Sequence, residues 1–314
     1  MKEVVTGSLG YDYIMNFSGR FADRIMPDKL HKISLSFLAD KLTKNLGGTA
    51  GNLAYTLKLL GIEPYIISAA GNDFSEYQQF LDKHHIASSG IRVVDDEPTG
   101  SYHVVTDSDD NQIGAFYSGA TKYNKELHIP ATAEFVVIGP NDPAAMKKFV
   151  TECRENKYRY LYDPAFQIDS MSPEELRFAI EGAELVIGND YEISLIEQKL
   201  GISHEELLNM GPKAVITTIG AKGSIIETRR EAIHVKPAKP KNVSDPTGAG
   251  DAYRGGFLAG YLRGFDLLTC GQMGAVAAVY TVEKYGTVTH QYTKEEFIKR
   301  YEENYGPWKS NQKL

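Results

Sequence analysis

The 314-residue sequence lacks several features that would assign it to other classes of protein. Its two cysteines, Cys153 and Cys270, are too few for a disulfide framework in a chain of this length, so a reducing compartment is expected. The formal net charge is −7 and no basic run is present, which argues against nucleic acid as a partner, because phosphate backbones bind clustered Lys and Arg. No apolar run approaches the ~20 residues of a membrane-spanning helix, and no signal-peptide pattern opens the chain. We therefore expect a cytoplasmic protein with no membrane partner.

The sequence instead alternates short apolar runs with patterns that start helices. Ser172-Pro-Glu-Glu175 has a capping residue, a proline at the first helical position and a glutamate that completes a capping box, and Ser203–Glu206 and Thr293–Glu296 repeat the box. Alternation of this kind predicts a mostly parallel central sheet with helices on both faces, an α/β fold whose ligands bind at the carboxyl ends of the strands. The expected strands are 4–5, 65–67, 135–138, 160–162, 185–187 and 214–216.

Two stretches, 11–40 and 93–121, interrupt the alternation. In the second, His103–Thr106 and Ile113–Tyr117 alternate around the turn Ser108-Asp-Asp-Asn111, which predicts a hairpin. Irregular segments of this length are usually functional in compact domains, so we interpret the two stretches as a small β lid over the substrate site. The α/β core is then expected to comprise 1–10, 41–92 and 122–314. The alternative is a pair of ordinary surface loops.

The segment Asp245-Pro-Thr-Gly-Ala-Gly-Asp251 carries the clearest chemical signal. It is a turn of small residues that opens into a helix, where free backbone N–H groups and the helix dipole favour an anion such as phosphate. A carboxylate at Asp251 would repel phosphate, but it suits the removal of a proton from an attacking hydroxyl. The segment therefore indicates phosphoryl transfer to an alcohol, although turn and capping chemistry alone could also explain it.

A second glycine cluster, Gly47-Gly-Thr-Ala-Gly-Asn52, leads into an expected helix over 53–60. Its small residues let a ligand approach the backbone, and Asn52 can exchange hydrogen bonds with a sugar hydroxyl. Tight packing of the helix on the sheet is the alternative explanation.

Together the two clusters resemble both sequence signatures of the PfkB, or ribokinase-like, kinase family. The second signature matches in full, from Asp245-Pro through Gly248-Ala-Gly-Asp251 to Gly255-Gly-Phe257, and the resemblance extends from Gly7 to about Phe297. The pattern is also similar to the adenosine-kinase-like branch of the family, except that Ser118 stands where proline is expected. That similarity lies in Gly47–Tyr55, Asp110–Gln112, Ala115–Ala120 and Val282–Thr287.

The resemblance implies a ribokinase-like fold and a role for each matching residue. Asp251 would be the general base, and the backbone N–H groups of Gly248, Ala249 and Gly250 would stabilise charge on the transferred phosphoryl group. Asp12, Gly47, Gly48 and Asn52 would hold the sugar of the acceptor. For Asp12, a simple turn position is the alternative.

The same resemblance implies a site for ATP and Mg²⁺. Asn189-Asp-Tyr-Glu192 matches an Asn-x-x-Glu motif, and Asn189 and Glu192 would hold Mg²⁺ through water, since Mg²⁺ prefers oxygen ligands and keeps several waters. Thr218, Gly220 and Gly223 match a turn near the ATP phosphates and ribose, beside Thr247, Gly248 and Gly250. A monovalent cation such as K⁺ near the anion site is left open.

The identity of the acceptor depends on weaker signals. The stretch 93–121 contains no Lys or Arg, which counts against a phosphorylated substrate, and the two stretches are rich in aromatic rings suited to stacking on a base. The resemblance to the adenosine-kinase-like branch implies the 5′-hydroxyl of adenosine as acceptor, and we expect Phe116 among the rings that contact it. A kinase for free ribose or fructose, and a non-catalytic nucleotide or nucleoside sensor, are the alternatives, and a monomer and a homodimer are both open.

Overall fold

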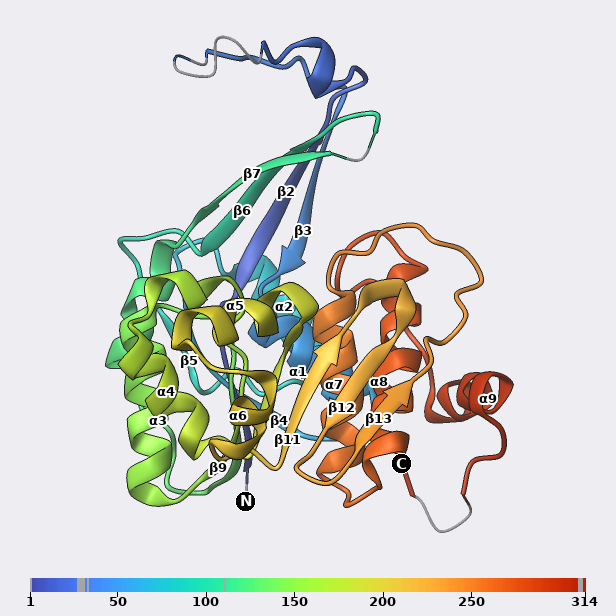
Figure 1. Cartoon of the computed structure of the whole chain (residues 1–314). Helices are drawn as coiled ribbons and strands as arrows, with labels where there is room; N and C mark the ends of the chain where they lie inside the picture. Colours follow the sequence, from blue (N-terminus) through green and yellow to red (C-terminus); the bar gives the residue numbers. More distant parts are fainter. Residues whose placement is uncertain (1, 27–31, 33, 110, 310–312) are drawn as a thin grey trace.

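The computed structural model describes residues 2–26, 32, 34–109, 111–309 and 313–314, which form an α/β core and a smaller sheet above it (Figure 1). Within the described residues, nine strands form the central sheet in the order β13-β12-β11-β10-β9-β8-β1-β4-β5. The strands from β11 to β5 pair in parallel, and β12 and β13 form an antiparallel edge. Their bounds are β1 Lys2–Thr6, β4 Pro64–Ala70, β5 Ile91–Val93, β8 Ala133–Ile138, β9 Arg159–Tyr162, β10 Leu185–Asn189, β11 Ala214–Thr218, β12 Ser224–Glu227 and β13 Ala232–Val235.

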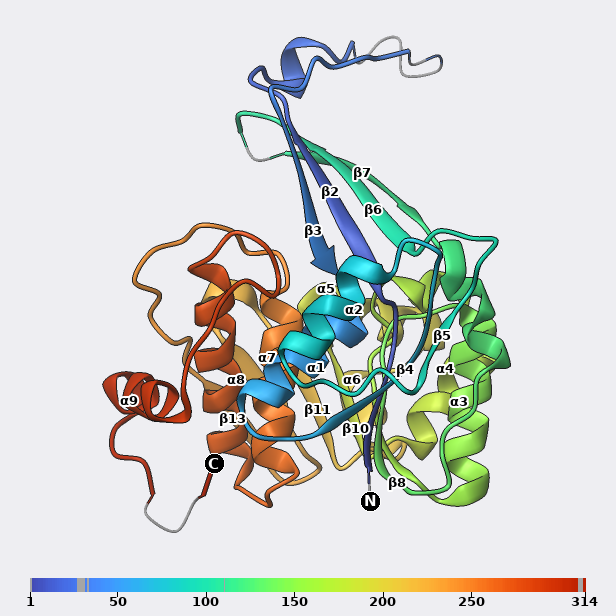
Figure 2. The ribbon, with the colours of Figure 1, turned by 180° about the vertical axis from the view of Figure 1, so that it is seen from behind.

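Helices cover both faces of this sheet, as the alternating pattern predicted. Successive strand residues point to opposite faces, so that Val5 and Ile187 enter one buried cluster whereas Val4 and Val186 enter the other. The first cluster includes side chains of α1 Thr49–Leu59, α2 Ser75–Lys83, α7 Ala249–Tyr261, α8 Leu267–Val282 and α9 Lys294–Tyr305 (Figure 2). The second includes side chains of α3 Pro143–Asn156, α4 Pro173–Gly182, α5 Asp190–Leu200 and α6 His204–Asn209. This architecture is the one that the resemblance to ribokinase-like kinases implies.

The local signals for strands and helix starts are confirmed. Each expected strand lies within a strand of the central sheet. Ser172, Ser203 and Thr293 each cap a helix through a complete capping box, in α4, α6 and α9 respectively. The helix expected over 53–60 begins earlier, at Thr49, because Gly48 adopts φ 86° and turns the chain into it. Among the described helices, none is long and apolar enough to cross a bilayer.

The second sheet has the order β3-β2-β6-β7 and rises from the edge at which the parallel strands end (Figures 1 and 2). The expected hairpin is the antiparallel pair β6–β7, although Asp110 of its turn lies outside the described residues, as do 27–31 and 33 of the first stretch. The bounds are β2 Gly10–Asn16, β3 Lys41–Gly47, β6 Gly100–Thr106 and β7 Gln112–Tyr117.

The structure corrects the expected boundary between the two parts. Residues 41–47 pair with β2 in the small sheet, whereas the sequence analysis assigned them to the core. This strand is half exposed and largely polar, so it lacks the apolar run of a core strand, and only its pairing with β2 defines it. Val93, expected in the lid, pairs with Ala70 in the central sheet. That the small sheet acts as a lid stays a prediction.

Candidate active site

The two glycine-rich helix starts meet in space. The side-chain Nδ2 of Asn52 in α1 donates a hydrogen bond to Oδ2 of Asp251 in α7 at 2.8 Å, across 199 residues of sequence. The two helices approach closely, since a Cβ added at Gly255 would lie 2.7 Å from the side chain of Thr56. The residues that the sequence analysis assigned to sugar binding and to proton removal therefore share one site.

The start of α7 is where the sequence predicts an anion site. Gly248 is its N-cap with φ 79°, a left-handed conformation that favours glycine, and a Cβ there would lie 2.8 Å from Thr287. The first turn of a helix presents N–H groups that have no acceptor within the helix. Of the three predicted donors, Ala249 directs its N–H to the carbonyl of Pro246 at 3.1 Å.

Asp245 joins this turn to the loop that follows α8. Its carboxylate accepts hydrogen bonds from the backbone N–H groups of Thr247, at 2.9 Å, and of Gly286, at 3.1 Å. In the same loop, Thr287 donates its hydroxyl to the carbonyl of Leu46 in β3 at 2.8 Å. The loop after α8 therefore lies beside the predicted anion site and also touches the small sheet.

Asp12 and Asp251 are two carboxylates held in surroundings that disfavour their charge. Burial raises the pKa of Asp12 to about 7, and the nearby carboxylates of Asp251 and Asp245 add to this shift. Burial also raises the pKa of Asp251 to about 6, against the opposing effects of Arg254 and of the Asn52 hydrogen bond. A Cβ at Gly47 would lie 2.3 Å from Oδ2 of Asp12, so a larger residue there would displace this carboxylate. Paired carboxylates with raised pKa values are typical of sites that move protons.

Arg254 is a site residue that the sequence analysis missed. It is buried one turn after Asp251 and forms an ion pair with Asp163, in which Nε lies 2.5 Å from Oδ2 and Nη2 donates a hydrogen bond to Oδ1 at 3.0 Å. Its Nη2 also lies 3.9 Å from Oε2 of Glu192. The sequence feature that could have identified it is a single arginine within a run of small and apolar residues in the same helix. The positive charge of Arg254 lowers the pKa of both the predicted base, Asp251, and the predicted metal ligand, Glu192, against the effect of burial.

Asn189 and Glu192 lie where parallel strands β10 and β11 end. Asn189 is paired with Thr218 of β11, so the predicted metal motif adjoins the predicted ATP turn. Glu192 accepts the N–H of Asn189 at 2.7 Å and the Asn189 side chain accepts the N–H of Glu192 at 2.8 Å, which fixes both side chains. Gly220 and Gly223 adopt φ 54° and 97° in the turn that follows Thr218.

The described residues contain no group of three or more His, Cys, Asp or Glu side chains that could enclose a metal. Mg²⁺ commonly binds one or two protein oxygens and completes its shell with water and substrate phosphates. Glu192 and Asn189 therefore fit a Mg²⁺ ion held through water, and they do not fit a metal enclosed by protein ligands alone.

Phe116 borders a small hollow between the two sheets. Asp12 and Phe116 both pair with Tyr102 of β6, one from each side, so both belong to the part of the small sheet next to the core. The ring of Phe116 lies 6.2 Å from that of Phe166, in the 3₁₀ helix η4 Ala165–Ser170. The hollow has a volume of about 110 Å³ and is lined by Ser8, Phe116, Ser118, Thr121, Pro140, Asn141, Asp142, Pro143, Phe166 and Gln167.

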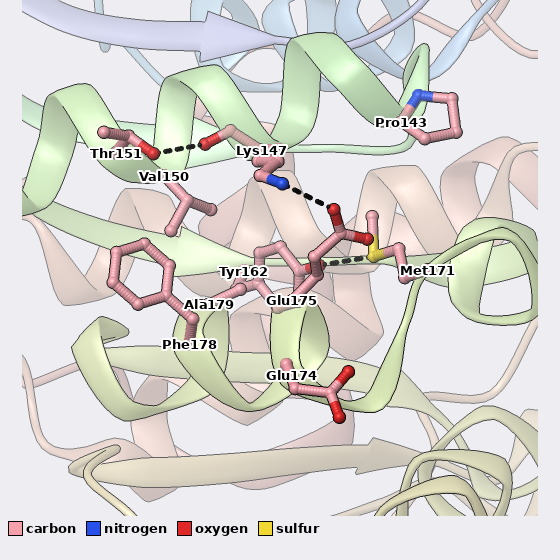
Figure 3. A pocket seen from close by; sticks show the side chains of 10 residues that line it. All are labelled: Pro143, Lys147, Val150, Thr151, Tyr162, Met171, Glu174, Glu175, Phe178 and Ala179. Carbon is pink, nitrogen blue, oxygen red and sulfur yellow. Dashed lines mark hydrogen bonds and ion pairs between the residues drawn. The ribbon is translucent and has the colours of Figure 1, made fainter.

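A larger cavity of about 380 Å³ lies between α3 and α4 and contains none of the predicted site residues (Figure 3). Its polar groups are already paired: Lys147 with Glu175 at 2.8 Å, and the hydroxyl of Tyr162 with the sulfur of Met171 at 2.9 Å. The predicted site residues therefore lie at the ends of the parallel strands and not in this cavity.

Comparison with known proteins agrees with the fold and with the motifs. Residues 11–294 match the model of the pfkB family carbohydrate kinases. A nucleoside kinase of Methanothermobacter thermautotrophicus is 34% identical over 309 residues, which cover 96% of each protein. The solved structure of Burkholderia thailandensis nucleoside kinase with inosine superposes with a TM-score of 0.90 at 32% identity, over 97% of this chain and 98% of that one. The solved structure of Methanocaldococcus jannaschii nucleoside kinase superposes with a TM-score of 0.87 at 32% identity, over 97% of this chain and 99% of that one.

The fold and the motifs define a kinase that transfers a phosphoryl group to a hydroxyl acceptor. The chain belongs to the pfkB family of carbohydrate kinases. The family resemblance drawn from the two glycine clusters is thereby confirmed.

Proposed function

We propose that this enzyme transfers the γ-phosphoryl group of ATP to the 5′-hydroxyl of a nucleoside, with adenosine as the first candidate. The observation that carries the proposal is the contact between Asn52 and Asp251, at the start of α7 and beside the small sheet. Relatives similar over nearly their whole length support it, since they are named nucleoside kinases and one was solved with inosine and with ADP-inosine.

Asp251 would remove the proton from the 5′-hydroxyl as the oxygen attacks the γ-phosphorus. With a pKa of about 6 it is mostly ionised at neutral pH and yet more basic than an exposed aspartate, which suits a general base. The backbone N–H groups of Gly248 and Gly250 would stabilise the negative charge that moves with the phosphoryl group, and the N–H of Ala249 would join them once it leaves the carbonyl of Pro246. Asp12, with Gly47, Gly48 and Asn52, would hold the ribose hydroxyls.

ATP would lie along the turn of Thr218, Gly220 and Gly223 and reach Thr247 at the anion site. Mg²⁺, held through water by Asn189 and Glu192, would neutralise phosphate charge. A monovalent cation is a further candidate near Asp245, whose carboxylate ties the anion turn to the loop after α8. The small sheet would close over the acceptor and exclude water, which limits hydrolysis of ATP.

The test is the initial rate of ADP release with Mg·ATP and adenosine, inosine, cytidine, ribose or fructose. We expect saturation at low concentration only with nucleosides. Asp251→Asn should lower kcat by ~10²–10⁴-fold, the range for loss of a positioned base, with little change in nucleotide binding. Asp82→Asn, at an exposed position in α2, is the matched control and should not change the rate.

Three outcomes would contradict parts of the proposal. Saturation by a free sugar alone would keep the reaction and replace the acceptor. Unchanged turnover by Asp251→Asn would remove Asp251 from the role of base. Binding of nucleosides without turnover of any acceptor would favour a sensor.

A further inference from the structure

A pair of buried asparagines connects the small sheet with the core beside the aromatic hollow. Asn124 lies in the 3₁₀ helix η3 Gly119–Glu126, which follows β7, and Asn141 lies between β8 and α3. Their exposed fractions are 0% and 3%. Buried amides at a sheet edge must find hydrogen-bond partners, because an unpaired buried polar group costs free energy.

Backbone groups fix the orientation of both amides. The N–H of Ala69 donates to Oδ1 of Asn124 at 2.5 Å, so the other end of that amide must be its NH₂ group. This NH₂ group donates to Oδ1 of Asn141 at 2.6 Å, and the N–H of Asp142 donates to the same oxygen at 2.8 Å. Because a backbone N–H can only donate, neither amide can be turned over without losing bonds.

The remaining group is therefore a donor. Nδ2 of Asn141 is buried and has no hydrogen-bond partner among the residues that the structure describes. Asn141 also lines the 110 Å³ hollow together with Phe116 and Phe166. A fixed donor without a partner, beside two rings that suit stacking on a base, indicates recognition of an acceptor atom on that base.

We propose that Asn141 determines acceptor specificity by donating a hydrogen bond from Nδ2 to a ring nitrogen of a purine base stacked beside Phe116 and Phe166. The inference rests on the proposed nucleoside kinase function and adds the chemical feature that the enzyme recognises. A free sugar has no such atom, and a base that presents only a donor at this position would leave Nδ2 unpaired.

Asn141→Asp tests the proposal with little change in shape. The aspartate keeps the oxygen that accepts from Asn124 and Asp142, and it replaces the NH₂ donor with a second oxygen. Asn156→Asp makes the same chemical change on the exposed last turn of α3 and serves as the control. The substrates are adenosine and its 1-deaza, 3-deaza and 7-deaza analogues, in each of which one ring nitrogen is replaced by C–H.

We expect the wild-type enzyme to show a KM roughly 10- to 100-fold higher for one of the three analogues, with kcat changed little, as for loss of a single buried hydrogen bond. Asn141→Asp should raise the KM of adenosine by a similar factor and should no longer distinguish adenosine from that analogue. Asn156→Asp should behave as wild type.

The inference is overturned if, for every deaza analogue, the fold-change in KM caused by Asn141→Asp equals its fold-change for adenosine. The substitution and the analogue would then act independently, so Nδ2 would contact none of the three ring nitrogens. If Asn141→Asp does not fold, as judged by circular dichroism, the wild-type series decides: equal KM values for all four nucleosides overturn the inference, and a loss for one analogue supports it. Failure of wild type to phosphorylate any nucleoside would instead refute the proposed function.

Discussion

Replacing Arg254 with methionine should lower the free energy of unfolding, because it removes the positive half of a buried ion pair. The guanidinium forms a buried ion pair with Asp163 and donates one hydrogen bond to it from Nη2, and the two side chains are 9% and 2% exposed. Methionine fills a similar volume but leaves Asp163 without a counter-charge. Breaking a buried ion pair from one side costs about 3–5 kcal/mol, because the remaining charge stays buried.

The neighbouring carboxylate adds to this effect. Oε2 of Glu192 lies 3.9 Å from Nη2 of Arg254. At this separation two unit charges attract by ~4 kcal/mol at an effective dielectric constant of about 20, before the cost of desolvation is subtracted. Asp163 and Glu192 both have a pKa raised by burial, and Arg254 opposes the rise in each. We therefore expect the variant to take up protons at these carboxylates, which limits the total loss to the lower end of the 3–5 kcal/mol range.

The assay is urea denaturation followed by circular dichroism at pH 7.5 and pH 5.5. Arg254→Met should lose about 3 kcal/mol of unfolding free energy at pH 7.5 and less at pH 5.5, where the carboxylates protonate more readily. Asp163→Asn in the Arg254→Met background should recover part of the loss. Arg230→Met, at an exposed position, is the control. A loss below about 1 kcal/mol at pH 7.5, the value of an ordinary surface pair, would refute the argument.

Two further predictions concern activity. In a pH profile, kcat/KM should fall as pH drops through about 6, because burial raises the pKa of Asp251 to about 6 and protonation removes the base. Burial raises the pKa of Asp12 to about 7, so this acidic decline should extend over a wider pH range than that of a single group. A profile that stays flat down to pH 5 would contradict the assignment. Phe116→Ala should raise the KM for adenosine by roughly 5- to 100-fold, the value of one stacked base, and leave the KM for ATP unchanged. Phe178→Ala in the cavity of Figure 3 is the control, because Phe178 is 39% exposed and Phe116 is 44% exposed. Equal effects of the two variants would contradict stacking.

Signals that are local in the sequence predicted most of the fold. Capping boxes at Ser172, Ser203 and Thr293 depend on four consecutive residues, and buried strands depend on short apolar runs, so both are visible without the structure. Strand β3 was missed because its polar sequence KLTKNLG is stabilised by pairing with β2 and not by burial.

The missed site residues depend on contacts that the sequence does not display. Arg254 meets Asp163 across 91 residues, and each of them alone is an ordinary charged residue. Asn124 and Asn141 are only 17 residues apart, but the orientation of their amides depends on the N–H groups of Ala69 and Asp142. Glycine motifs located the site, whereas the groups that orient it became visible only in three dimensions.

The charge balance around the base suggests why the nucleotide would enter with its metal. When Asp163, Glu192 and Asp251 are ionised, they carry three negative charges against the one positive charge of Arg254, which leaves a net −2. Such a site repels the phosphates of free ATP, and the N–H groups at the start of α7 provide only partial positive charge. A divalent cation arriving on the phosphates would weaken this repulsion. On this reasoning Arg254 would hold the carboxylates in place, and Mg²⁺ bound to the phosphates would lower the repulsion between ATP and the same site.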